Sequence, residues 1–102
     1  MTVVVTRDVA ARFRGFLASC MLEIAPGVYT APKMNRAVRE RVWAVLEEWF
    51  GELGGAGIVM TWLDPLAPGG QRIKVLGSPP YELYECNDVF LARKRDLQFE
   101  DD

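Results

Sequence analysis

The stretch that decides the fold is LEIAPGVYT, residues 22–30. Pro26-Gly27 is the pair that a type II β-turn prefers, because proline presets φ at the second position and glycine accepts a positive φ at the third. Short apolar and β-branched runs flank this pair, Leu22–Ala25 before it and Val28–Thr30 after it. The segment therefore predicts a β-hairpin.

Upstream of the hairpin the sequence predicts a strand followed by a helix. Thr2–Thr6 is β-branched at every position and indicates a short buried strand. Asp8 then stands where a helix N-cap would, because apolar residues follow it at helical spacing. Those residues are Val9, Phe13, Phe16, Leu17 and Cys20. We expect a helix that begins after Asp8 and carries Arg12 and Arg14 off its apolar stripe.

Downstream of the hairpin lies the longest periodic stretch of the chain, which begins at about Asn35 and is stopped by Gly54-Gly55. One face of this predicted helix is apolar: Val38, Val42, Val45, Leu46, Trp49 and Leu53. Ile58–Leu63 predicts the next strand. After the turn residues Pro68-Gly69-Gly70, Arg72–Leu76 is expected to pair back against it.

The order strand, helix, strand, strand, helix, strand is the split βαβ, or ferredoxin-like, arrangement. We therefore expect an α+β fold (βαββαβ) with an added strand and both helices on one face of an antiparallel sheet. The strands are apolar enough for both sheet faces to be dry, which predicts a homodimer packed sheet to sheet. The alternative is a C-terminal segment that folds over its own sheet. We divide the chain into a domain, residues 1–78, and a C-terminal segment with a solvated tail, residues 79–102, in which Asp88–Ala92 is a candidate strand.

The residue types that are missing limit the chemistry more than the ordinary composition does. The 102 residues include no histidine and two cysteines, Cys20 and Cys86. Ser-His-Asp and Cys-His nucleophilic systems, imidazole ligation and a four-thiolate zinc site are thereby excluded. Hydrolytic chemistry would have to use carboxylates and a hard cation. Two lone cysteines without a secretory signal predict reduced thiols in a cytoplasmic protein, and no apolar stretch is long enough to cross a membrane.

The net charge of −2 conceals two halves of opposite sign. Residues 1–45 hold seven basic and three acidic residues, a net charge of +4, whereas residues 46–102 hold five basic and eleven acidic residues, a net charge of −6. Six of the seven basic residues in the first half are arginines, which suit phosphate groups. The pattern favours a molecule that offers one half to polyanions, although an ordinary solvated surface is the competing interpretation.

Two sets of residues are candidates for a functional site. Arg12 and Arg14 on the first helix, with Arg36 and Arg39 near the start of the second, can follow a duplex backbone without reading bases. Asp8 stands at the end of the first strand. In a two-fold dimer, two such carboxylates could share one Mg²⁺ or Mn²⁺ through waters, but the pattern alone favours a plain helix cap. Three tryptophans are expected in the core rather than on a stacking platform: Trp43, Trp49 and Trp62.

Taken in order, five stretches of the chain resemble the type I-E branch of the CRISPR-associated "Cas-two" family over roughly residues 2–77. The stretches that carry the resemblance are Val3–Thr6, Arg12–Gly15, Leu22–Ile24 running into Gly27–Tyr29, Arg39–Trp43 and Ile58–Trp62. The resemblance implies a ferredoxin-like homodimer that bridges two copies of the larger "Cas-one" integrase and holds double-stranded DNA during spacer acquisition.

The resemblance also implies roles for individual residues. Arg12 and Arg14 would contact phosphates by their position in the matched motif, with Arg36 and Arg39 as additions, and the segment after Gly77 would dock on the integrase. Members of the family are also described as metal-dependent endonucleases with an acidic residue at the end of the first strand. Here Arg7 stands where an acid is expected and Asp8 follows one position later, so the catalytic and Mg²⁺-binding role would fall on Asp8.

Three functions therefore remain open from the sequence. The first is the adaptation scaffold, which binds duplex DNA through arginines and needs no chemistry of its own. The second is a Mg²⁺-dependent nuclease that cuts DNA or RNA on its own. The third is a protein-interaction module of the same fold that binds neither nucleic acid nor metal, in which the arginine surface would be neutral or acidic.

Overall fold

The computed structural model of the protein describes residues 1–77, 81–86 and 89–94, with side chains described for residues 1–77. The elements in chain order are β1 (Thr2–Arg7), α1 (Ala11–Cys20), β2 (Leu22–Ala25), β3 (Val28–Ala31), α2 (Arg36–Leu53), β4 (Gly57–Leu63), the short 3₁₀ turn η1 (Pro68–Gly70), β5 (Gln71–Gly77), β6 (Tyr81–Cys86) and β7 (Val89–Lys94).

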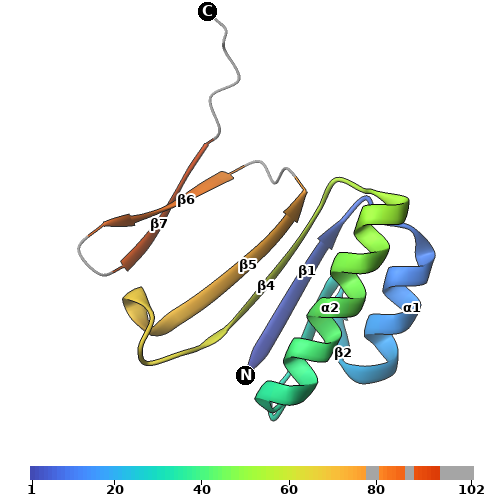
Figure 1. The fold of residues 1–102 in the computed structure, drawn as a ribbon, viewed down its shortest axis with the longest axis horizontal. Coiled ribbons are helices and arrows are strands. Elements are labelled where there is room, and N and C mark those ends of the chain that lie inside the picture. The colour runs from blue at the N-terminus through green and yellow to red at the C-terminus, as the bar shows by residue number, and fades with distance from the viewer. Residues whose placement is uncertain (78–80, 87–88, 95–102) are drawn as a thin grey trace, which may run out of the picture.

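Five of the strands form one sheet in the order β2-β3-β1-β4-β5, and every neighbouring pair is antiparallel. Both helices lie on the same side of this sheet (Figure 1). The predicted α+β, ferredoxin-like arrangement with one added strand is therefore confirmed, and β5 is the addition at the sheet edge.

The predicted hairpin is confirmed together with its turn. Gly27 has a φ of 77°, in the left-handed region that glycine tolerates best. Its carbonyl oxygen accepts a hydrogen bond of 2.7 Å from the backbone N–H of Thr6. A Cβ at this position would lie 2.8 Å from the Thr6 carbonyl oxygen. The turn thus requires glycine for its conformation and also for its close approach to the end of β1.

The core fills the space between the sheet and the helices. Val4 in β1 pairs with Tyr29 on one side and Met60 on the other, and all three side chains are fully buried. The helices cover them with buried apolar side chains: Phe13 and Leu17 from α1, and Val42, Trp43 and Leu46 from α2. Fully burying one such side chain stabilises the fold by about 1.5–3 kcal/mol. The predicted apolar stripes are thus confirmed in part: Phe13, Leu17, Val42 and Leu46 are buried in the core, whereas Cys20 and Leu53 are exposed.

Neither described helix lies on the opposite face of the sheet. Val5 and Val75 on this open face expose 41% and 39% of their surface. Among the described side chains, β1 is thus buried on one face. Burial of its other face, against a second copy or against the C-terminal segment, stays a prediction. We call this surface the open face; its apolar or threonine side chains are Val3, Val5, Val28, Thr30, Val59, Thr61, Ile73 and Val75.

The predicted N-cap of α1 is wrong. The helix begins at Ala11, and Ala10 is its N-cap without a side-chain hydrogen bond. Asp8 instead has a φ of 50°, and its carbonyl oxygen accepts a hydrogen bond of 3.2 Å from Ala56. The chain has to turn sharply where it leaves β1, and aspartate is among the residues that tolerate this left-handed conformation. Val9 consequently precedes the helix instead of forming its first turn.

The C-terminal part contains more strand than the sequence suggests. β6 and β7 pair in antiparallel as a separate two-stranded sheet, and β7 lies against η1. β6 was not expected, since Pro79-Pro80 indicates a break. Arg93 and Lys94, expected in a solvated tail, lie in β7. Residues 95–102 of that tail, and Asp88 at the start of the expected strand, fall outside the described residues.

Candidate nucleic-acid interface

Arg12 is held on an aromatic platform at the end of the helical layer. Its guanidinium lies 4.0 Å from the ring centroid of Trp49 in α2. Trp49 in turn packs edge-on against Phe13 and Phe16, at centroid distances of 5.9 and 5.4 Å. A cation–π contact at an exposed site contributes about 0.5–1 kcal/mol, which is enough to favour one side-chain orientation. Trp49 is therefore half-buried and supports Arg12, and is not solely the core residue that the sequence predicted.

Arg14 is exposed on the same helix and lies close to the hydroxyl group of Tyr29. That hydroxyl is buried and makes no hydrogen bond of ordinary geometry. Burial raises the pKa of Tyr29 and the charge of Glu23 raises it further, whereas Arg14 opposes the shift. Arg14 therefore lies near the Tyr29 hydroxyl and near the Glu23 carboxylate. In the described part of the chain it forms no ion pair.

Asp8 is exposed at the end of β1, as expected, and shares a shallow pocket with Arg14, Thr6 and Gly27. Across residues 1–77, no three histidine, cysteine, aspartate or glutamate side chains gather as a metal site would require. A single carboxylate beside a guanidinium does not provide the oxygen-rich environment that Mg²⁺ or Mn²⁺ prefers. The predicted Mg²⁺ or Mn²⁺ site needs Asp8 of two copies, and it stays a prediction.

At the other end of the helical layer, Asn35 fixes the start of α2. Its side-chain oxygen accepts a hydrogen bond of 2.9 Å from the backbone N–H of Val38, which confirms the predicted helix start. Arg36 follows directly and pairs with Glu40 at 2.9 Å. The hydrogen bond from Arg36, and then its charge, lower the pKa of Glu40. Both side chains are exposed, so this pair leaves Arg36 accessible from solvent.

Arg39 lies one turn further along α2 and is half-buried. Its guanidinium lies 4.4 Å from the ring centroid of Trp62, and its Nε is buried without a hydrogen-bond acceptor in the described part of the chain. A buried donor that lacks a partner costs about 1–3 kcal/mol. Trp62, like Trp49, thus supports an arginine, while Trp43 alone is buried as predicted.

Arg39 lines an open groove of about 490 Å³ between α2 and strands β4 and β5, which we call the α2–β5 groove. Its charged lining residues are Arg36, Arg39, Glu40, Asp64, Arg72 and Lys74. Sequence reasoning missed Arg72 and Lys74 because they belong to the acidic half of the chain. Arg72 and Lys74 are two positions apart in a predicted strand, so their side chains lie on the same face of the sheet. This spacing is the sequence signal that could have placed them together.

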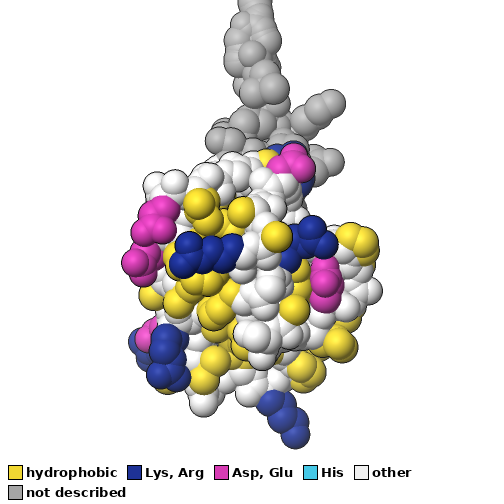
Figure 2. Space-filling view, turned by 90° about the vertical axis from the view of Figure 1, so that its right-hand side faces the viewer, with side chains coloured by type: hydrophobic (Ala, Val, Ile, Leu, Met, Phe, Trp, Pro, Cys, Tyr) yellow, Lys and Arg dark blue, Asp and Glu magenta, His cyan; other side chains and the backbone are white. Residues whose placement is uncertain are grey.

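The four predicted arginines lie at separate places on the two helices. Arg12 lies against Trp49 in α2, whereas Arg36 is the first residue of α2. Along the axis of α2, Arg36 and Trp49 are separated by about 20 Å. On the face seen in Figure 2, basic side chains lie in several separate places, some of them beside acidic ones. The structure therefore brings Arg36 and Arg39 together at one groove. Arg12 and Arg14 share the start of α1 but leave it on different sides, toward Trp49 and toward Tyr29, so the four arginines do not form one patch.

Cys20 is exposed and forms no disulfide bond among the described side chains, and its reduced state stays a prediction. Burial raises its pKa, and the neighbouring Ser19 opposes that shift. Neither described helix is both long and apolar enough to span a membrane.

One family of known proteins matches this chain. The family model is described as CRISPR-associated protein (Cas_Cas2CT1978), and it matches residues 1–91. The matched range includes the whole five-stranded sheet, both helices, β6 and the first residues of β7.

Proposed function

The chain belongs to the type I-E Cas-two family of CRISPR-associated proteins, and from this membership we propose that it acts in spacer acquisition as a DNA-binding scaffold. In this function a homodimer bridges the Cas-one integrase and holds the backbone of a DNA duplex. The observation that carries the proposal is the pair of exposed arginines on α1, of which Arg12 is oriented by Trp49.

The open face supports the dimer. It presents mainly β-branched side chains from four neighbouring strands, and water is released when a second copy covers such a surface. A two-fold axis through this contact would leave the helical layers of both copies facing outward. Four arginines, Arg12 and Arg14 of each copy, would then be available to one duplex.

The chemistry of these arginines supports contact with phosphates. Guanidinium groups form forked hydrogen bonds with phosphate oxygens, and such contacts position a duplex without reading its bases. Arg36 is exposed and can add a further contact despite its pairing with Glu40. Arg39 is less accessible because it is half-buried in the α2–β5 groove, so its contribution to the same contact is expected to be smaller.

The β6–β7 hairpin supports docking on the integrase. It forms a two-stranded sheet of its own, and in the described part of the chain neither strand pairs with the main sheet. A strand with an unpaired edge can add to the sheet of another protein through backbone hydrogen bonds. The hairpin is therefore the segment that we assign to the partner.

The salt dependence of duplex binding tests this function. A dimer that uses Arg12 and Arg14 of both copies neutralises four phosphates or more. The logarithm of its affinity should then fall with the logarithm of salt concentration with a slope of about −3.6 or steeper. Fluorescence anisotropy with a labelled duplex measures the slope, and sedimentation velocity on the same sample measures the mass. A monomer, or a slope near zero, would contradict the proposal.

A further inference from the structure

We propose that the α2–β5 groove is a docking site for a peptide segment of a partner protein in which carboxylates flank an apolar side chain. This inference goes beyond the proposed DNA scaffold and does not depend on it. Three features of the groove carry it: a surplus of positive charge, cations that are held on indole rings, and an apolar rim.

The positive surplus remains after the groove's own acids are paired. Glu40 binds Arg36 at 2.9 Å, and Asp64 binds Arg72 at 3.2 Å. Asp64 is held in addition by a hydrogen bond of 3.0 Å from the backbone N–H of Leu66. Arg39 and Lys74 then have no ion pair among the described residues. The groove therefore carries two cations that an external carboxylate can neutralise.

Both unpaired cations are positioned by aromatic rings. Arg39 lies 4.4 Å from the centroid of Trp62, and Lys74 lies 5.8 Å from that of Trp43. Such contacts restrict the side chains before a ligand arrives, so less conformational entropy is lost on binding. Nothing in the described part of the chain accepts a hydrogen bond from Nε of Arg39. This Nε is itself buried, whereas the Arg39 side chain as a whole is half-buried and lines the groove.

The rim indicates a protein ligand in preference to a nucleic acid. Leu63 and Leu66 line the groove and expose 73% and 93% of their surface. Exposed leucines at a concave site suit apolar side chains of a partner and gain nothing from a phosphate backbone. The two acids of the groove would repel consecutive phosphates, whereas a peptide can place its carboxylates beside Arg39 and Lys74 only. The groove volume of about 490 Å³ is in the range of ordinary ligand sites.

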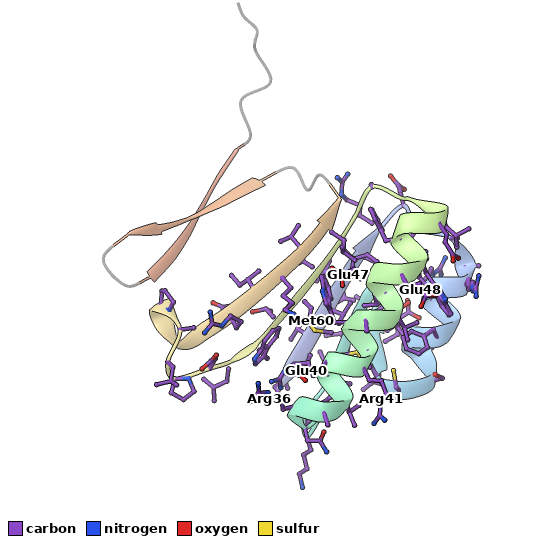
Figure 3. All side chains as sticks on the ribbon, viewed as in Figure 1. Arg36, Glu40, Arg41, Glu47, Glu48 and Met60 are labelled. Atoms are coloured by element: carbon purple, nitrogen blue, oxygen red, sulfur yellow. The ribbon has the colours of Figure 1, made fainter. Side chains whose placement is uncertain are left out.

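α2 also supplies a control residue. Figure 3 shows Arg36 and Glu40 on the side of α2 that faces Met60 in β4, and Arg41 on the other side of the helix. Arg41 is exposed, and it does not line the groove. The variant Arg41→Gln therefore removes one positive charge from α2 without changing the proposed site.

The experiment measures peptide binding to the full chain by fluorescence anisotropy. The probe is a fluorescein-labelled peptide, Glu-Leu-Asp-Phe-Glu-Gly-Gly, and its control is the same peptide with glutamine and asparagine in place of the acids. We expect saturable binding of the acidic peptide and at least about tenfold weaker binding of the neutral one. Lys74→Gln and Arg39→Gln should each weaken binding about tenfold, with Arg41→Gln within about twofold of the parent.

Two results would overturn the proposal: no saturable binding up to about 1 mM peptide, or equal affinity for the acidic and neutral peptides. Arg39 contacts Trp62, so circular dichroism melting of Arg39→Gln controls for its folding, and Lys74→Gln provides an independent reading at an exposed site. Duplex binding through Arg12 and Arg14 is measured separately, so either proposal can fail alone.

Discussion

The two faces of the five-stranded sheet are built from the same kinds of residue but have different roles. On the covered face, Val4 is fully buried beneath two helices. On the open face, the neighbouring Val5 remains 41% exposed. The β-branched run of β1 therefore has one face in the core, and its other face is the one that we assign to the proposed dimer. Which face is covered is decided by the helices and not by the strand.

The largest expected effect comes from placing a charge on each face in turn. Val4→Asp places a carboxylate in the apolar core, where no described side chain can pair with it. The variant should lower the free energy of unfolding by about 3–5 kcal/mol. Val5→Asp places the same group at a partly exposed site, so the fold should persist while the dimer dissociates. Chemical denaturation and sedimentation velocity of both variants measure the two effects. A monomeric but otherwise normal Val4→Asp, or a dimeric Val5→Asp, would reverse the assignment of the faces.

A smaller effect is expected at Tyr29, on the covered face. Its raised pKa means that the folded protein holds the phenolic proton more tightly than the unfolded chain does. The stabilisation that comes from this tighter proton binding is fully present below the ordinary tyrosine pKa of 10.0. It is lost as the pH rises through the raised pKa of the folded protein. Tyr29→Phe keeps the ring and removes the unpartnered hydroxyl, so near neutral pH it should change stability by about 1 kcal/mol or less.

The measurement for this prediction is the unfolding free energy of the parent and of Tyr29→Phe between pH 8 and about pH 11. Stability of the parent should fall more steeply on the alkaline side than that of the variant. Parallel curves for the two proteins would show that Tyr29 titrates alike in the folded and unfolded states.

Local signals in the sequence were sufficient for much of this fold. The Pro26-Gly27 turn and the Asn35 cap of α2 follow from requirements that a few neighbouring residues meet on their own. Asp8 was assigned as a cap because a cap and a sharp turn after a strand both favour aspartate. Its hydrogen bond with Ala56, which is remote in the sequence, could not be read from the pattern.

Less of the candidate site could be predicted from the sequence, because it too depends on contacts between residues that are far apart in the chain. Arg12 and Arg14 stand out because basic residues gather in the first half of the chain. Arg72 and Lys74 meet Arg39 only after β5 has paired with β4, so their shared groove is a product of tertiary structure. The supporting roles of Trp49 and Trp62 are likewise contacts between separate elements.

The most direct test of the account compares two charge-matched double variants in duplex binding. Arg12→Gln with Arg14→Gln removes the proposed phosphate contacts of α1, and Arg72→Gln with Lys74→Gln removes two positive charges from the α2–β5 groove. We predict that the first pair weakens duplex affinity about a hundredfold or more and that the second changes it by less than about threefold. Equal losses, or the larger loss in the groove variant, would contradict the assignment of the DNA contact to α1.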